Sequence, residues 1–170
     1  MTLLYEFDDR DLLTSVLAGE GVHLEPARIL DGLTDAQAHT KPHDLPYSIA
    51  DLVSHMCFWQ EWFNACLNEG FTGIPQHSVD GWPAAQAGGW EALRERYIRS
   101  IDEAKRITTE SGSLARSLLP PDARVASLAR ESRGSALLRG AMHNSHHLGQ
   151  IITMRRLLGL WPPPGGTIEW

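Results

Sequence analysis

The sequence predicts an all-α protein, a bundle of four helices around one core. Apolar residues recur at helical spacing in four separate segments, and prolines and glycines divide these segments from one another. No stretch alternates apolar and polar residues for long enough to form a sheet. Because 170 residues suit one well-developed core, we expect residues 1–170 to form a single domain.

The first helical segment is expected over residues 9–33. Its apolar stripe consists of Leu12, Leu13, Val16, Leu17, Leu24, Ile29, Leu30 and Leu33. Gly19 and Gly21 interrupt this stripe, so the segment forms either one bent helix or two shorter helices. Residues 40–47 carry Pro42 and Pro46 and are expected to form a connection.

A second helix is expected to follow Ser48 and to end at Gly70. Ser48 suits an N-cap, and Asp51 three residues later completes an acidic variant of the capping box. The stripe behind it keeps helical spacing through Ile49, Leu52, Met56, Trp59, Phe63 and Leu67. Residues 71–89 are rich in proline and glycine, which predicts a long loop of the kind that often walls a pocket.

Two further helices are expected over residues 90–110 and 132–160. The third helix carries the stripe Trp90, Leu93, Tyr97, Ile101, Ala104 and Ile107. The fourth and longest helix carries Leu137, Ala141, Leu148, Ile151, Ile152 and Leu158. Gly159 and the proline-rich residues 161–166 end it.

The composition argues against several classes of function. Acidic residues outnumber basic ones 21 to 15, whereas a protein that binds nucleic acid normally carries a basic patch. No apolar run approaches the roughly 20 residues of a membrane span, and residues 1–13 lack the pattern of a signal peptide. We therefore expect a cytoplasmic protein that binds neither nucleic acid nor membrane. Cys57 and Cys66 are expected to be small, reduced core residues.

Two of the eight histidines have the spacing of a metal site. His143 and His147 lie four residues apart inside the longest expected helix, so both rings lie on one face and can bind one ion. His39 and His43 share this spacing, but Pro42 lies between them, and we assign that pair to a solvent loop. His146 is expected to point away from the pair, toward the surface.

His55 lies on a different helix, in the middle of an inward stripe formed with Leu52, Trp59, Trp62, Phe63 and Cys66. A single histidine in such a place is more often a hydrogen-bonded core residue than a ligand. Three imidazoles in one apolar interior would be costly to leave unpaired, and a shared metal ion would satisfy all of them. The residues alone support a metal site and a hydrogen-bonded core about equally.

Two stretches of the chain resemble motifs of the DinB/YfiT-like superfamily. The run His143–Ile151, followed by Arg155-Arg156 and Trp161-Pro162, resembles its last-helix motif, and Ser48–His55 with Trp59 resembles an earlier one. The ending 165–170 is also similar, so the resemblance spans essentially the whole chain. It implies a four-helix bundle with a long crossover, a homodimer, and three metal-binding histidines that match His55, His143 and His147.

The resemblance also implies a type of chemistry. Characterised members include metal-dependent thiol transferases that use bacillithiol, mycothiol or glutathione, and a thiol-dependent maleylpyruvate isomerase. A metal-dependent enzyme that activates a low-molecular-weight thiol, for transfer to a small-molecule electrophile or for isomerisation of it, is therefore expected. Two alternatives stay open: a metal-dependent hydrolase that uses metal-bound water, and a non-catalytic metal-binding stress-response protein.

Three neutral nitrogen ligands would leave an open position on the ion, as in catalytic rather than structural sites. Among divalent ions Zn²⁺ and Ni²⁺ are favoured, with Co²⁺, Fe²⁺ and Mn²⁺ as alternatives. Beyond the ligands, Gln150 is the one candidate for contact with water or substrate. Asp51 lies one turn before His55 and is a candidate hydrogen-bond acceptor for its ring, although helix capping explains Asp51 more simply. Trp59 and Trp62 are either pocket residues or core.

Overall fold

The computed structural model describes residues 9–69, 78–110, 112, 114–118 and 132–166. These residues form six α-helices and one short 3-10 helix, in the order α1 (Arg10–Ala18), α2 (Pro26–Ile29), α3 (Asp35–His39), α4 (Ile49–Glu69), η1 (Ser78–Gly81), α5 (Trp90–Glu110) and α6 (Arg133–Leu157). Over the described ranges no strand forms, and the one β-type pairing is an isolated bridge between Ser117 and Ser132. The predicted all-α class is confirmed.

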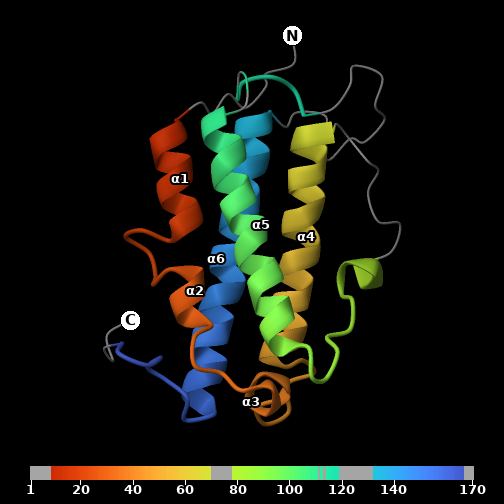
Figure 1. The fold of residues 1–170 in the computed structure, drawn as a ribbon, viewed down its shortest axis with the longest axis vertical. Helices are drawn as coiled ribbons and strands as arrows, with labels where there is room; N and C mark the ends of the chain where they lie inside the picture. Colours follow the sequence, from red (N-terminus) through yellow and green to blue (C-terminus); the bar gives the residue numbers. More distant parts are fainter. Residues whose placement is uncertain (1–8, 70–77, 111, 113, 119–131, 167–170) are drawn as a thin grey trace.

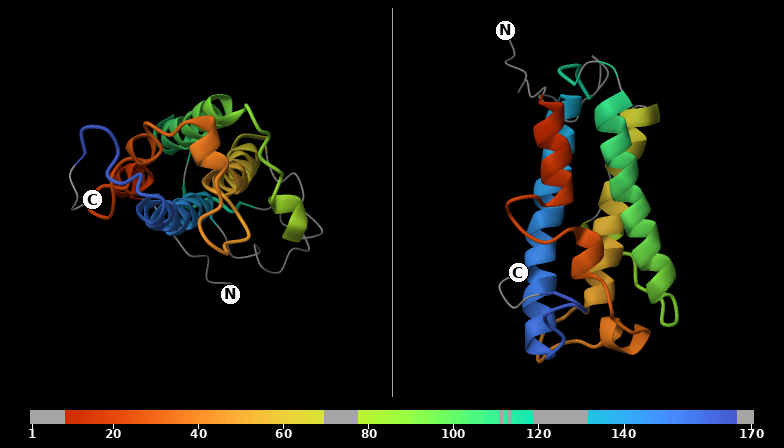
Figure 2. Two further views of the ribbon diagram at one scale, coloured as in Figure 1. Left: turned by 90° about the horizontal axis from the view of Figure 1, so that it is seen from below. Right: turned by 60° about the vertical axis from the view of Figure 1, so that its left-hand side comes forward.

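Helices α1, α4, α5 and α6 pack side by side as a bundle (Figures 1 and 2). Helix α4 packs against α5 and α6, and α1 packs against the same two helices from the opposite corner. Figure 1 shows α4 and α5 running upward, while α1 and α6 run downward. Because α4 and α5 are parallel, a crossover connection joins them, of which the structure describes residues 78–89.

The first side of the bundle consists of two helices rather than one. Asp9 caps α1 by accepting a hydrogen bond from the Leu12 N–H (2.9 Å), and Gly19 ends the helix with a left-handed φ of 81°. Helix α2 then continues below α1 on the same side (Figure 1). Of the two alternatives for residues 9–33, the structure shows two short helices.

Helix α3 was not expected from the sequence. Thr34 and Gln37 form a capping box at its start, and His39 is its last residue. The prediction that His39 lies in a loop is therefore wrong, since its Nδ1 contacts the Asp35 carbonyl of the same short helix (2.9 Å). His43 is exposed and lies outside the helices, as expected.

The predicted bounds of the three long helices are confirmed to within three residues. Ser48 and Asp51 form the expected capping box, with Ser48 N–H to Asp51 Oδ2 at 2.9 Å and Asp51 N–H to Ser48 Oγ at 3.2 Å. Ser132 caps α6 in the same way. None of the described helices combines the length and apolar character needed to cross a bilayer.

The apolar core divides into two clusters along the bundle. One cluster includes Ile49, Leu52, Tyr97 and Ile151, and the other includes Leu13, Phe63, Ala104 and Leu137. Cys57 and Cys66 are buried, one in each cluster, and no disulfide joins them. On α6, residues 142–147 separate the members of one cluster from those of the other, so the helix carries its predicted histidines between them.

Candidate metal centre

The three predicted ligands meet between α4 and α6. His143 Nε2 lies 3.1 Å from His55 Nε2 and 3.2 Å from His147 Nε2. One ligand atom from each of the three residues lies within 4.8 Å of the others, and among the described residues no carboxylate or thiol joins this group. We call His55, His143 and His147 the histidine triad. His146 is exposed and is not part of it, as expected.

Two hydrogen bonds on the outer side of the triad set the tautomers of its rings. His55 Nδ1 lies 2.6 Å from the Gly81 carbonyl oxygen, and His147 Nδ1 lies 2.6 Å from Gln150 Oε1. Oxygens of this kind only accept hydrogen bonds, so each Nδ1 donates its proton outward. In the neutral ring, the Nε2 atom of His55 and that of His147 must then carry a lone pair facing His143.

This arrangement fits one divalent ion. A neutral His143 ring can donate a single proton, so at least one of its two close nitrogen contacts has no hydrogen between the atoms. A cation shared by the three nitrogens removes that conflict. Ligands about 2.0–2.1 Å from a tetrahedral ion lie about 3.3 Å from each other, close to the two nitrogen separations observed here.

Burial keeps the triad in the neutral form that a metal ion requires. Desolvation, together with the neighbouring His147 and His55 rings, lowers the pKa of His143 to about 4. Burial also lowers the pKa of His55, against the opposing effect of the Gly81 carbonyl, and it lowers the pKa of His147. The imidazoles therefore remain unprotonated, and able to bind metal, below the pH at which free histidine ionises.

For the metal-free protein we expect the free energy of unfolding to decrease as the pH falls from about 6.5 toward 4. The triad histidines have lowered pKa values when folded and ordinary values of about 6.5 when unfolded. The unfolded chain thus binds more protons in this window, and acid favours it. Urea unfolding of chelator-treated protein at several pH values measures the effect. His143→Ala should reduce the slope, and an unchanged slope would contradict the assignment.

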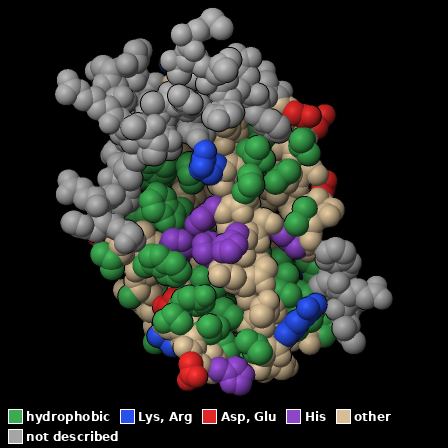
Figure 3. Space-filling view, turned by 180° about the vertical axis from the view of Figure 1, so that it is seen from behind, with side chains coloured by type: hydrophobic (Ala, Val, Ile, Leu, Met, Phe, Trp, Pro, Cys, Tyr) green, Lys and Arg blue, Asp and Glu red, His purple; other side chains and the backbone are tan. Residues whose placement is uncertain are grey.

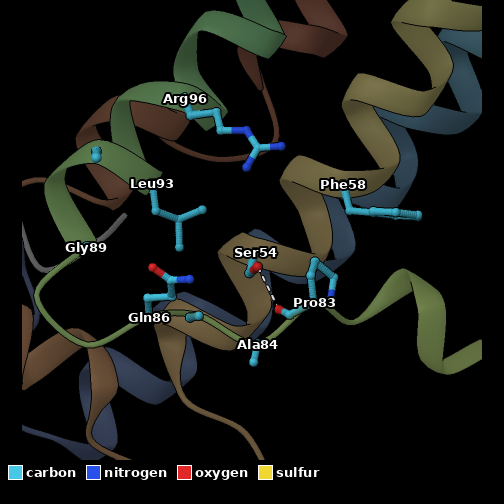
Figure 4. A pocket seen from close by; sticks show the side chains of 10 residues that line it. Ser54, Phe58, Pro83, Ala84, Gln86, Gly89, Leu93 and Arg96 are labelled. Atoms are coloured by element: carbon cyan, nitrogen blue, oxygen red, sulfur yellow. Dashed lines mark hydrogen bonds between the residues drawn. The ribbon is translucent and has the colours of Figure 1, made fainter.

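The crossover supplies one wall of the site, as the sequence suggested. The Trp82 ring stacks on His55 with centroids 3.8 Å apart and an angle of 18° between the planes. Ser54 Oγ donates to the Pro83 carbonyl (2.7 Å; Figure 4), which holds this part of the crossover against α4. A Cβ at Gly81 would lie 2.8 Å from Trp59 Nε1, so only glycine lets the backbone approach His55 this closely.

Gly81 and Trp82 are site residues that sequence reasoning missed. The available signal was the Gly81-Trp82-Pro83 run in a connection already expected to wall a pocket. Trp59 packs against this wall, whereas Trp62 packs against the core cluster that contains Phe63.

The two other candidate residues have clear positions. The Asp51 carboxylate accepts hydrogen bonds from the Ser48 backbone and hydroxyl, which agrees with its capping role. The Gln150 amide oxygen orients His147 from the side remote from the three converging nitrogens. Direct contact of Gln150 with water or substrate remains a prediction.

Hydrogen bonds between buried amide side chains fix the position of α6 along the axis of α4. Asn144 Nδ2 donates to Gln60 Oε1 (2.7 Å), Gln60 Nε2 donates to Asn64 Oδ1 (3.0 Å), and Asn64 Nδ2 donates to the Ser100 carbonyl (2.8 Å). Because buried amides are costly to leave unpaired, this chain resists sliding or rotation of the helices. Asn144 follows His143 directly, so the same network sets the distance between His143 and His55.

The triad meets solvent through His143. His55 and His147 are buried, whereas His143 is partly exposed. Figure 3 shows histidine side chains at the surface in the middle of one face, with hydrophobic side chains above and below them. Three neutral nitrogen ligands with an open side have the donor set of a catalytic metal site.

Sequence comparison agrees with this geometry. The DinB superfamily matches residues 26–151, a span that contains His55, His143 and His147. Comparison with curated proteins and with solved structures gave no significant match. The match covers most of the chain and the whole histidine triad, and the chain therefore belongs to the DinB superfamily.

Proposed function

We propose that the protein binds one divalent metal ion through His55, His143 and His147 and uses it to activate a low-molecular-weight thiol toward a small electrophile. The observation that carries this proposal is the convergence of three Nε2 atoms, with two Nδ1 atoms held from outside, next to an open face. Zn²⁺ and Ni²⁺ are the favoured ions, and Co²⁺, Fe²⁺ or Mn²⁺ suit the same nitrogen ligands.

When bound, the ion would lower the pKa of an incoming thiol and so increase the fraction that is ionised. The chain's own residues prepare the site for this. The Gly81 carbonyl and the Gln150 amide hold two ligand rings in place and make them better donors. Trp82 covers one face of His55 and excludes water from it. Three neutral ligands would leave the full charge of a bound ion uncompensated, which would favour an anionic sulfur.

The reaction needs no oxidant or reductant. When the thiolate adds to an electron-poor double bond, the sulfur lone pair forms the new C–S bond. The neighbouring carbon then takes up the proton that the thiol released. In substitution, the leaving group departs with the bonding pair. We further propose that the protein is cytoplasmic and forms a homodimer, as the family resemblance implies.

Turnover with defined thiols tests the proposal. Metal-loaded and metal-depleted protein should be assayed with monochlorobimane and bacillithiol, mycothiol or glutathione. We expect turnover to need both the metal and one particular thiol, and to persist below the pH at which that thiol ionises when free. Cobalt-substituted protein should gain a sulfur-to-cobalt charge-transfer band with the same thiol.

His146→Ala is the matched control, because His146 lies on α6 next to the triad but outside it. This variant should keep its metal and the cobalt band. If no thiol changes the cobalt spectrum or supports turnover, the thiol proposal fails, and hydrolysis or binding without turnover replaces it.

A further inference from the structure

We propose that a groove beside the triad binds the electrophile and selects a small, neutral, largely apolar molecule with a hydrogen-bond acceptor. The inference deepens the proposed function and rests on it. The groove, here called the Gln150 groove, has a volume of about 390 Å³ and is lined in part by Leu45, Tyr47, Gly149, Gln150, Met154 and Leu157. Its volume is near the lower end for ligand pockets, which suits a small molecule rather than a dinucleotide.

The groove adjoins the triad at two points. Gln150 lines it and is hydrogen-bonded to His147. Tyr47 also lines it and stacks on Trp82, with centroids 6.0 Å apart, and Trp82 in turn covers His55. A ligand in the groove would therefore lie against residues that touch two of the three histidines.

The lining of the groove favours an uncharged ligand. The described residues that form it include His146 and Thr153 but no Asp, Glu, Lys or Arg. Leu45, Met154 and Leu157 make much of the surface apolar. A carboxylate or phosphate placed here would lose hydration without gaining a Lys or Arg partner, which is unfavourable.

Gln150 supplies the polar contact that is hydrogen-bonded to a triad histidine, while Tyr47, His146 and Thr153 are the other polar residues of the lining. The Gln150 amide oxygen is already used by His147, and no other described residue is bonded to its nitrogen. The NH₂ group is thus a donor that remains for a ligand in the groove, and it suits a carbonyl or nitro oxygen. An electron-withdrawing group of this kind also makes a neighbouring carbon open to attack by sulfur, so recognition and reactivity point to the same class of molecule.

A second cavity, somewhat larger than the Gln150 groove, is a weaker candidate. Figure 4 shows it between α4, α5 and residues 83–89, with a volume of about 440 Å³. None of the triad histidines lines it, and its Arg96 side chain is already paired with both oxygens of Glu61 (2.6 and 2.5 Å). Of these two cavities, only the Gln150 groove has a lining residue that is hydrogen-bonded to a triad histidine.

Binding of two matched probes to metal-depleted protein tests the groove independently of metal chemistry. 4-Nitroacetophenone is neutral, and 4-nitrobenzoate has nearly the same shape with one negative charge. By calorimetry at pH 8 we expect the neutral probe to bind at least about tenfold more tightly, equivalent to about 1.4 kcal/mol. Equal or tighter binding of the benzoate would overturn the proposed selectivity.

Two substitutions locate the binding. Gly149→Phe should fill the groove, since a Cβ at this exposed helix position meets no atom within 4 Å, and it should weaken the neutral probe at least about tenfold. Thr109→Phe adds the same side chain at an exposed position of α5, which does not line the groove, and should change nothing. Leu157→Lys places a cation at the half-exposed rim and should shift the preference toward the benzoate.

Unchanged probe binding in both groove variants would overturn the assignment. A groove covered by a second copy of the chain would also overturn it. In that case neither probe would bind, and sedimentation would show that Gly149→Phe converts a dimer into a monomer. Because these measurements use metal-free protein, their outcome does not depend on metal binding or thiol turnover. Failure of the groove proposal can therefore be distinguished from failure of the proposed function.

Discussion

Replacing His143 with alanine should remove nearly all bound metal from a protein that otherwise carries about one divalent ion per chain. His143 Nε2 is the nitrogen that lies within 3.2 Å of both other ligand nitrogens. Its loss therefore removes the central one of the three metal ligands. Even the loss of an outer hydrogen-bond partner typically costs about 10–100-fold in metal affinity, and we expect more than about 100-fold for the ligand itself. His55→Ala and His147→Ala should have similar effects.

Elemental analysis after dialysis measures this loss, and circular dichroism shows whether the helices remain. The matched control is His146→Ala, which changes an exposed histidine on the same helix and should keep the metal. The two core clusters do not depend on an ion, so the variants should stay helical. Wild-type metal content in all three triad variants would rule out the site.

Arg155→Ala should lower the free energy of unfolding by about 3–5 kcal/mol, because its guanidinium is buried and serves three backbone carbonyls. It donates to Leu160 O at 3.0 Å, to Asp31 O at 2.9 Å, and to Ile29 O. These bonds join α6 to the end of α2 and to the chain after α6. Truncation would leave the three acceptors without their donor, inside a core that water reaches poorly.

Urea unfolding with a constant m-value measures this change. Arg156→Ala provides the control, since Arg156 is the adjacent residue, is exposed, and lies at nearly the same distance from the Trp161 ring as Arg155 (5.7 and 5.8 Å). It should cost less than about 1 kcal/mol. Similar losses in the two variants would show that stacking on Trp161, and not the buried hydrogen bonds, accounts for the effect.

Local features of the sequence determined the long helices. The stripes of α4, α5 and α6 repeat over many turns, and caps such as Ser48 with Asp51 mark where two of them begin. Helix α3 was missed because its five residues are too few to show a stripe. The same local logic placed His143 and His147 on one face, since residues four apart on a helix are neighbours whatever surrounds them.

The tertiary structure decided what lies around those histidines. The sequence put His55 on an inward stripe, but its 3.1 Å contact with His143 depends on how α4 and α6 pack, which the Asn144–Gln60 contact helps to fix. The Gly81 carbonyl reaches His55 across 26 residues of chain, and its position follows from the path of the crossover.

Tertiary packing also makes Arg155 different from Arg156. The sequence presents them as equivalent neighbours, and only the packing of α6 against α2 buries the first and leaves the second exposed. Helical periodicity is set by residues close together in the chain, so a single sequence can reveal it. The tautomers of the triad, the Trp82 wall and the Gln150 groove depend on groups brought together from distant segments, and only the folded chain fixes their distances.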